Sequence, residues 1–279
     1  METTSFIINN KTYDISIKGS PPFLSGADVV LSNEQADIAF HQPWYQDGYT
    51  AVQFLDNDEF SSLKDGLTNC VKKIIVDELG INVDNFSLDN YHHFITSSEQ
   101  HYKVVSKTRD LFPEDFNFPL TTIIPKFEKI LGFSLSDISP FDGSQLHIIV
   151  RINRPFSTDF NPPHKDIYEG VDDANHIPQF INLWIPICGV TDKSSLPVVK
   201  SSHLLKESEL SRTFEGAVVE GNKYRVRMIK SWNGDITLTR PEIKYGEVLF
   251  FTSHLVHGLA INEEEDSTRV ALEFRLFKK

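Results

Sequence analysis

Residues 145–154, QLHIIVRINR, form a run in which polar and apolar side chains alternate. A period of two predicts a β-strand, because successive side chains of a strand point to opposite faces. Arg151 and Asn153 fall on one predicted face, whereas Val150 and Ile152 fall on the other. We expect the apolar face to pack in a core, and the polar face either to be solvated or to line a binding cavity.

Four further β-rich runs follow this one, separated by turns. They are QFINLWIPICGV at 179–190, KYRVRMIK at 223–230, GEVLFFTS at 246–253 and TRVALEFRLF at 268–277. Several short strands at modest spacing are typical of an antiparallel sandwich or barrel rather than of βαβ units. We therefore predict a mostly β fold with a double-stranded β-helix core of the jelly-roll or cupin-like type, flanked by helices.

The N-terminal half predicts the helices that would support this core. Residues 49–55 are strand-like, and Asp56 or Asn57 can cap a helix after them. Its apolar positions recur at helical spacing as far as Gly80, which would end the helix as a C-terminal glycine does. A second helix is predicted over residues 125–131.

We expect the whole chain, residues 1–279, to be one domain. It would comprise an N-terminal extension over 1–45, a helical support over 47–140 and the β core over 145–277. An insertion at about 205–240 is expected to lie near the mouth of the core. Alternating runs broken by turn residues predict a short hairpin in the extension and another in the insertion.

Composition excludes several classes of partner. The chain carries 39 acidic residues against 27 lysines and arginines, for a formal net charge of −12, so duplex nucleic acid and anionic membranes would be repelled on average. No apolar run approaches a membrane span, and no secretory leader is recognised. Cys70 and Cys188 supply neither a disulfide framework nor zinc spacing, which favours a reducing cytoplasm. The expected partner is a small-molecule substrate, and the oligomeric state stays open.

The segment 161–170, NPPHKDIYEG, predicts part of a metal site. If it is extended, His164 and Asp166 share one face, so that one strand end offers an imidazole and a carboxylate to one ion. A second imidazole would come from His254 or His257, which lie on opposite faces of a regular strand because they are three residues apart. Two histidines and one carboxylate leave three positions open on an octahedral ion, as in non-haem iron(II) oxygenases.

Five blocks of the sequence carry a family resemblance. In chain order they are DGYTAVQFLDNDEF, NPPHKD, NLWIPICGVTDKSSLPVVKSSH, GEVLFFTSHLVHG and NEEEDSTRVALEFRL. Together, over roughly residues 47–277, they resemble the phytanoyl-CoA dioxygenase family of Fe(II)/2-oxoglutarate-dependent oxygenases. One block departs from the family pattern, with Lys200 where a proline is usual and Ser201 where a glycine is usual, so the shape of that loop and its contact with substrate are not implied.

The resemblance implies a set of roles. Iron(II) would be held by His164, Asp166 and His257, since His257 is followed by glycine as the family's distal histidine is. Arg269 would hold the distal carboxylate of 2-oxoglutarate, and Arg275, on the same face of the strand, is its rival. The implied reaction uses O2, converts 2-oxoglutarate into succinate and CO2, and hydroxylates an aliphatic carbon of a small metabolite. Asp166 favours hydroxylation, because halogenating relatives carry a small residue there.

Three further residues are predicted to line the cosubstrate site. Arg151 lies on the polar face of its strand, while Asn182 and Trp184 share a face of theirs. A solvated Arg151 and a core Trp184 are the structural alternatives. Two other functions also remain possible, namely a cupin-like metal-binding isomerase or hydrolase and an inactive binding relative. Neither of these requires Arg269 at the cavity.

Overall fold

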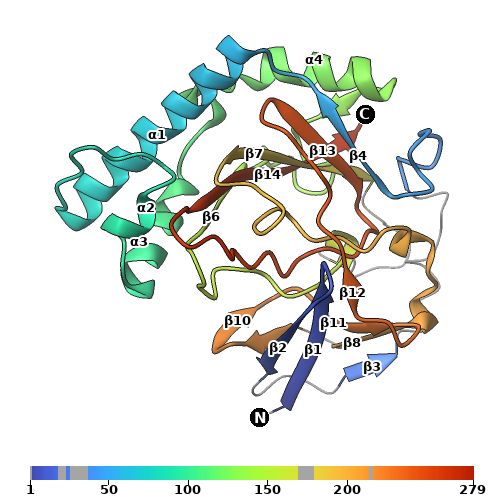
Figure 1. Ribbon diagram of the computed structural model, residues 1–279. Coiled ribbons are helices and arrows are strands. Elements are labelled where there is room, and N and C mark those ends of the chain that lie inside the picture. Colours follow the sequence, from blue (N-terminus) through green and yellow to red (C-terminus); the bar gives the residue numbers. More distant parts are fainter. Residues whose placement is uncertain (1, 18–22, 26–36, 169–178, 214–215) are drawn as a thin grey trace.

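The computed structural model describes residues 2–17, 23–25, 37–168, 179–213 and 216–279. In Figure 1 the helices cover one side of a central sheet, and two smaller sheets lie on its other side. The fold is mostly β, a double-stranded β-helix flanked by helices, as the sequence predicts. Within the described residues, no helix is both long and apolar enough to cross a membrane.

The six-stranded central sheet is entirely antiparallel. Its strands run in the order β4 (Tyr49–Gln53), β13 (Glu247–Thr252), β7 (Phe180–Cys188), β14 (Arg269–Lys278) and β5 (Leu135–Ser136), with β6 (Ile149–Asn153) also paired with β14. All nine residues of β7 are buried, because the sheet is covered on both faces. The predicted strands at 179–190, 246–253 and 268–277 are thereby confirmed, and the run at 145–154 forms a strand over Ile149–Asn153 only.

The two faces of this sheet differ in chemistry. The face toward the helices is apolar and includes Val150 and Ile152, as the alternation predicts. On the other face, cross-strand pairing sets Arg269 beside Asn153, and Arg275 beside Asn182. Polar side chains from neighbouring strands are therefore gathered on the inner face, where a cavity can form.

Helices pack on the apolar face of the sheet (Figure 1). They are α1 (Asn57–Leu79), α2 (Tyr91–Phe94), α3 (Ser98–Thr108) and α4 (Leu120–Leu131), with a 3-10 turn at Pro113–Phe116. α1 begins with a capping box between Asp56 and Glu59 and ends at Gly80, whose φ of 63° is left-handed, so both predicted boundaries are confirmed.

The prediction for α4 was wrong at its start, because the helix begins at Leu120 rather than at Pro125. Pro125 lacks the N–H that would bond to the carbonyl of Thr121, which normally ends or kinks a helix. Here Thr121 is exposed, so water can satisfy its carbonyl, and Ile123 and Phe127 bury the apolar stripe of the helix on both sides of the proline.

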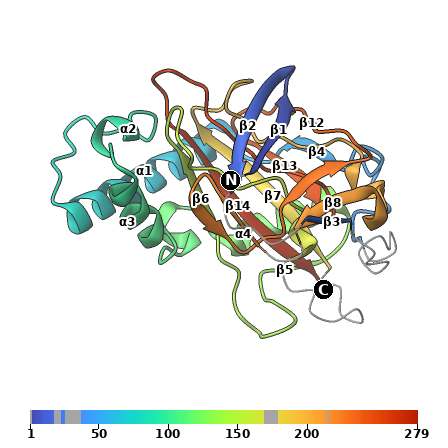
Figure 2. The same cartoon turned by 90° about the horizontal axis from the view of Figure 1, so that it is seen from below.

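Two small sheets form the second layer, seen from below in Figure 2. One has the order β10 (Asn222–Tyr224), β9 (Ala217–Val219), β2 (Lys11–Ile17), β1 (Glu2–Ile8) and β12 (Thr237–Leu238); the other has β11 (Ile229–Trp232), β8 (Leu210–Thr213) and β3 (Phe23–Ser25). Both predicted hairpins are confirmed, and the first turns at Asn9 and Asn10, which have positive φ. The predicted extension and insertion thus share one sheet, while their exact domain bounds remain a prediction.

The run 223–230 does not form the single strand that its composition predicts. The chain bends at Val226, so that β10 and β11 belong to different sheets. Alternation continues through the bend, which is why the pattern alone conceals it.

Ser201, which stands where the resembled family usually has a glycine, has a glycine-like backbone conformation. Its φ of 64° is left-handed, the conformation that glycine adopts most easily. Its backbone N–H donates to the Asp47 carbonyl at 3.0 Å, and its hydroxyl donates to the Gln46 carbonyl at 2.7 Å. Lys200 forms an ion pair with Asp47 at 3.0 Å. These contacts offset the cost of a non-glycine residue in that conformation.

Candidate metal centre

The three predicted metal ligands lie close together in the structure. His164 and His257 exchange two backbone hydrogen bonds, of 2.9 and 3.0 Å, which set their rings side by side. The Nε2 atom of His164 lies 3.3 Å from Asp166 Oδ1, and that of His257 lies 3.8 Å from Asp166 Oδ2. The three ligand atoms all lie within 4.8 Å of one another, and all three side chains are buried.

The backbone at this motif differs from the predicted extended strand. His164 is extended, but Asp166 opens a 3-10 turn, η4 (Asp166–Tyr168). Lys165 points away from the metal site and is fully buried, with its Nζ donating to Glu207 at 3.1 Å. Tyr168 donates to the same carboxylate at 2.8 Å. The contacts of Lys165 and Tyr168 with Glu207 hold η4 in place and so orient Asp166. A local sequence pattern could not predict them, because Glu207 is some forty residues away.

The two imidazoles present the nitrogens that a metal requires. The Nδ1 atoms of His164 and His257 lie 2.7 and 3.0 Å from the carbonyls of Pro162 and Leu255. A carbonyl accepts only, so each Nδ1 carries a proton, which leaves Nε2 as the nitrogen that a metal would bind in place of any proton shared with Asp166. His257 Nε2 is buried and has no hydrogen-bond partner within the described residues. This donor set fits a divalent transition metal.

The charges around the triad keep the carboxylate ionised. Burial acts to raise the pKa of Asp166, but Arg275, whose guanidinium lies 2.9 Å from Oδ1, together with both imidazoles holds it well below its usual range. Burial and the adjacent His164 lower the pKa of His257 to about 4, so that it is a neutral ligand. Burial would also lower the pKa of His164, but its hydrogen bond to Asp166 and the charge of that group raise it.

A cavity of about 360 Å³ joins the two histidines to Arg269. Arg269 is 2% exposed, and it donates to Asn153 and lies 5.8 Å from the Trp184 ring. Its Nε has no hydrogen-bond partner, and no carboxylate of the described chain pairs with it. Burial and the charges of Arg240 and Arg151 lower its pKa to about 9. The guanidinium is thus placed to receive an anion from the cavity.

Arg151 also lines this cavity, but it is already paired. Its Nε and Nη2 donate to the two carboxylate oxygens of Glu273 at 2.9 and 2.7 Å. Arg151 and Glu273 also border a larger cavity of about 910 Å³, which contacts His164, Asp166 and Arg275. Arg151 therefore borders both cavities while its side chain stays 27% exposed, so its role toward a cosubstrate remains a prediction.

Two predicted lining residues lie outside the cavity lining. Trp184 is fully buried beside Arg269, and Asn182 is buried with both amide atoms lacking partners in the described chain. Neither borders the 360 Å³ or the 910 Å³ cavity. Their roles toward a cosubstrate remain predictions.

His254 lies apart from the triad. Its Nδ1 is 3.5 Å from Asp37, which also accepts a hydrogen bond from Thr252. β13 ends at Thr252, so the parity of a regular strand does not decide between His254 and His257. The backbone hydrogen bonds between His164 and His257 place His257, and not His254, beside the other two ligands.

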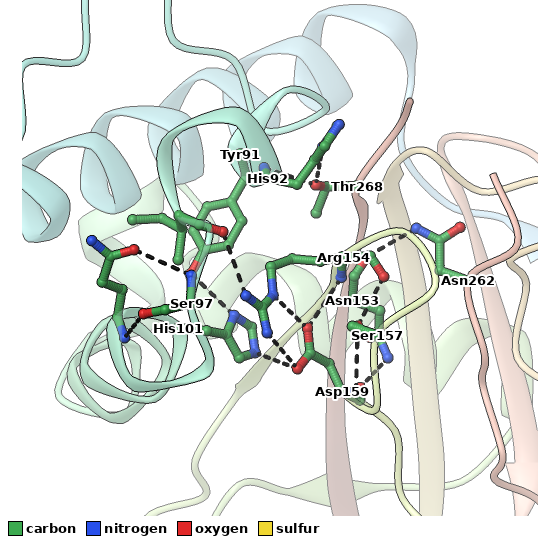
Figure 3. Close-up of polar contacts among 12 residues, drawn as sticks. Tyr91, His92, Ser97, His101, Asn153, Arg154, Ser157, Asp159, Asn262 and Thr268 are labelled. Atoms are coloured by element: carbon green, nitrogen blue, oxygen red, sulfur yellow. Dashed lines mark hydrogen bonds and ion pairs between the residues drawn. The ribbon is translucent and has the colours of Figure 1, made fainter. Parts of the chain in front are cut away.

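A polar cluster beside the cavity fixes its wall (Figure 3). Arg154 donates to Asp159 from Nε at 2.8 Å and from Nη2 at 3.2 Å. His101 lies 3.6 Å from the same carboxylate and 3.1 Å from the Tyr91 hydroxyl. Asp159 borders the 360 Å³ cavity, so the cluster connects α3 to the candidate site.

Because His101 is mostly buried, we expect the folded protein to lose stability at acidic pH. Burial lowers its pKa from 6.5 to about 4, so between these values the unfolded chain binds a proton that the folded chain does not. The unfolding free energy therefore falls as the pH drops below 6.5, by about 2 to 3 kcal/mol at pH 4.5 for this group. His101→Gln should lose that much less than wild type between pH 7.5 and 4.5 in urea titrations. An exposed-site control, His41→Gln, should match wild type, and an equal slope for His101→Gln would contradict the account.

Known proteins resemble the chain only in overall fold. No family model and no curated relative matches it. Among solved structures, AviO1 from Streptomyces viridochromogenes Tue57 is 15% identical with a TM-score of 0.48, covering 88% of this chain and 95% of that one. The non-heme alpha ketoglutarate dependent carbocyclase SnoK from nogalamycin biosynthesis is 13% identical, with a TM-score of 0.43 and coverages of 93% and 87%.

A third solved structure is the non-heme alpha ketoglutarate dependent epimerase SnoN, also from nogalamycin biosynthesis. It is 15% identical, with a TM-score of 0.41, and the match covers 84% of this chain and 79% of that one. SnoN has also been solved in complex with Fe3+, alpha ketoglutarate and a nogalamycin compound. Similarity at this level assigns no activity, so the function has to be argued from the site itself.

Proposed function

We propose that this protein is a non-haem Fe(II)/2-oxoglutarate-dependent dioxygenase that hydroxylates an aliphatic carbon of a small-molecule metabolite. The observation that carries the proposal is one cavity lined by both histidines of the His-Asp-His triad and by a buried arginine without a carboxylate partner in the described chain. The resemblance to the phytanoyl-CoA dioxygenase family and a cytoplasmic location belong to the same proposal.

Each part of the site has a distinct task in this proposal. His164, Asp166 and His257 would hold the iron, with both Nδ1–H groups fixed by backbone carbonyls. Arg269 would bind the distal carboxylate of 2-oxoglutarate by charge-assisted hydrogen bonds. When bound, the iron and its cosubstrate supply the oxidising chemistry: one oxygen atom of O2 enters succinate, the other enters the substrate as hydroxyl, and CO2 leaves.

The remaining residues would orient the substrate and exclude water. The 910 Å³ cavity borders His164 and Asp166 but not Arg269, and Phe274, Phe277 and Leu146 contribute to its wall. A substrate in this cavity would present a carbon to the open side of the metal. A cosubstrate in the 360 Å³ cavity would lie next to both histidines and Arg269, because all three side chains line it.

The position of Arg269 favours the proposed oxygenase over a cupin-like isomerase or hydrolase. An isomerase or hydrolase requires the metal ligands but has no need for a buried, unpaired guanidinium at the cavity. Burying such a charge without a partner costs stability, so an anionic ligand is the physical reason to keep it.

The test measures succinate from 2-oxoglutarate by NMR, with Fe(II) and air but without added substrate. An oxygenase of this kind can convert 2-oxoglutarate slowly even when no substrate is present. We therefore expect succinate formation that depends on both iron and O2. Asp166→Asn is the matched variant, because it keeps the shape of the side chain and removes its charge. Equal succinate from wild type and Asp166→Asn would refute the proposal.

Arg275 is expected to position Asp166. Its guanidinium lies 2.9 Å from Oδ1, so the Arg275→Gln variant should leave that carboxylate less well oriented. Loss of such a partner weakens metal binding by about 10-fold or more. Anaerobic Fe(II) titration should show this loss while 2-oxoglutarate, added at saturating iron, binds as before. The exposed Arg225→Gln is the control, and unchanged iron affinity in Arg275→Gln would contradict the role.

A further inference from the structure

A second cluster of metal-ligating side chains lies away from the triad. His92 and His93 of α2 and Asp266 of the loop before β14 have ligand atoms within 4.8 Å of one another. Both histidine Nε2 atoms approach the same oxygen, Asp266 Oδ1, at 2.9 and 2.6 Å. Two imidazoles from one short helix and a carboxylate from a distant segment thus meet at one point.

The cluster has the supporting contacts of a metal site. His92 Nδ1 lies 2.8 Å from the Thr268 hydroxyl, which also accepts a hydrogen bond from the His92 backbone N–H at 3.2 Å (Figure 3). A hydroxyl can accept the Nδ1 proton as well, which leaves the Nε2 lone pair for a metal.

We propose that His92, His93 and Asp266 form a second divalent-metal site, selective for a borderline ion such as Zn²⁺. Imidazole ligands favour Zn²⁺ over Mg²⁺ and Ca²⁺. Tetrahedral zinc requires ligand atoms about 3.3 Å apart, slightly more than the present distances. The Asp266 side chain is 74% exposed and His93 is 54% exposed, so both can move outward by that amount. Water completes the fourth position.

The ion would join the helical layer to the β-helix. Asp266 lies three residues before Arg269, and the neighbouring Thr268 donates its backbone N–H to the Asp89 carbonyl at 2.7 Å just before α2. Zinc at this junction stabilises the folded chain, because the unfolded chain does not bring the three ligands together. The site is independent of the proposed oxygenase function and of its metal.

Equilibrium dialysis against Zn²⁺ with elemental analysis tests the site. Four proteins are compared: wild type, His93→Ala, His164→Ala and the double variant. His93 is chosen because it is exposed and, unlike His92, has no contact with Thr268. We expect two, one, one and zero equivalents, and a zinc-dependent rise in the melting temperature of His164→Ala that His93→Ala abolishes in that background. His41→Ala, at another exposed histidine, should bind as wild type does.

The outcomes separate this site from the triad. Two equivalents in His93→Ala, or one in the double variant, would overturn the second site. If wild type binds one equivalent and only His93→Ala loses it, the second site stands and the proposed triad fails. Ca²⁺ should give no equivalents at the second site, and binding of Ca²⁺ that is lost in His93→Ala would overturn its selectivity.

Discussion

The His257→Ala variant is expected to lose iron binding and turnover together. His257 Nε2 is buried without a hydrogen-bond partner in the described structure, and its backbone is paired with that of His164. Losing a residue that merely supports a ligand costs about 10- to 100-fold in metal affinity, so losing a ligand itself should cost at least about 100-fold. Anaerobic Fe(II) titration and succinate formation measure the two effects.

His254→Ala is the matched control for this variant. It removes a buried histidine three residues away that contacts Asp37 rather than the triad. Both variants remove a buried imidazole, and His254→Ala also removes a contact of the buried Asp37, so the control should lose at least as much stability, but only His257→Ala should lose iron. Iron binding and succinate formation retained in His257→Ala would refute the assigned ligand set.

The Arg269→Leu variant should lose 2-oxoglutarate while keeping iron. A buried charge pair with a ligand carboxylate is worth about 3 kcal/mol, so the dissociation constant of 2-oxoglutarate should rise about 100-fold. Leucine fills much of the space, and it removes a charge whose burial lowers the pKa of Arg269 to about 9, so the apo-protein should stay folded. Titration of the iron-loaded protein with 2-oxoglutarate provides the measurement.

Two comparisons sharpen this result. Arg269→Lys should restore part of the affinity, because it keeps the charge but not the two-pronged geometry of the guanidinium. Arg151→Gln should have a smaller effect than Arg269→Leu, because Arg151 is paired with Glu273. If Arg269→Leu binds 2-oxoglutarate as wild type does, the cupin-like alternative gains and the cosubstrate site is wrong.

Local patterns predicted the parts of the fold that local physics controls. The capping box at Asp56 and the glycine at Gly80 set the ends of α1, and both follow from side-chain and backbone geometry within one turn. Alternation sorted β6 into an apolar face against helices and a polar face toward the cavity. A period of two identifies a face whatever the partner strand is.

Long-range contacts account for what the sequence did not predict. The bend at Val226 and the 3-10 turn at Asp166 depend on which strands and side chains lie nearby, not on local periodicity. Lys165 has its partner Glu207 about forty residues away, so its burial leaves no local signal. The parity of the terminal strand placed Arg275 on the inner face, but only the structure brings it to Asp166.

The most direct test of the central claim adds Fe(II) and then 2-oxoglutarate to the anaerobic apo-protein and records the visible spectrum. The account predicts a weak charge-transfer band from the chelate, present in wild type and His254→Ala and absent in His257→Ala. At a 2-oxoglutarate concentration that saturates wild type, Arg269→Leu should show little of it. A protein that binds a divalent metal at the triad but gives no band with 2-oxoglutarate would contradict the claim.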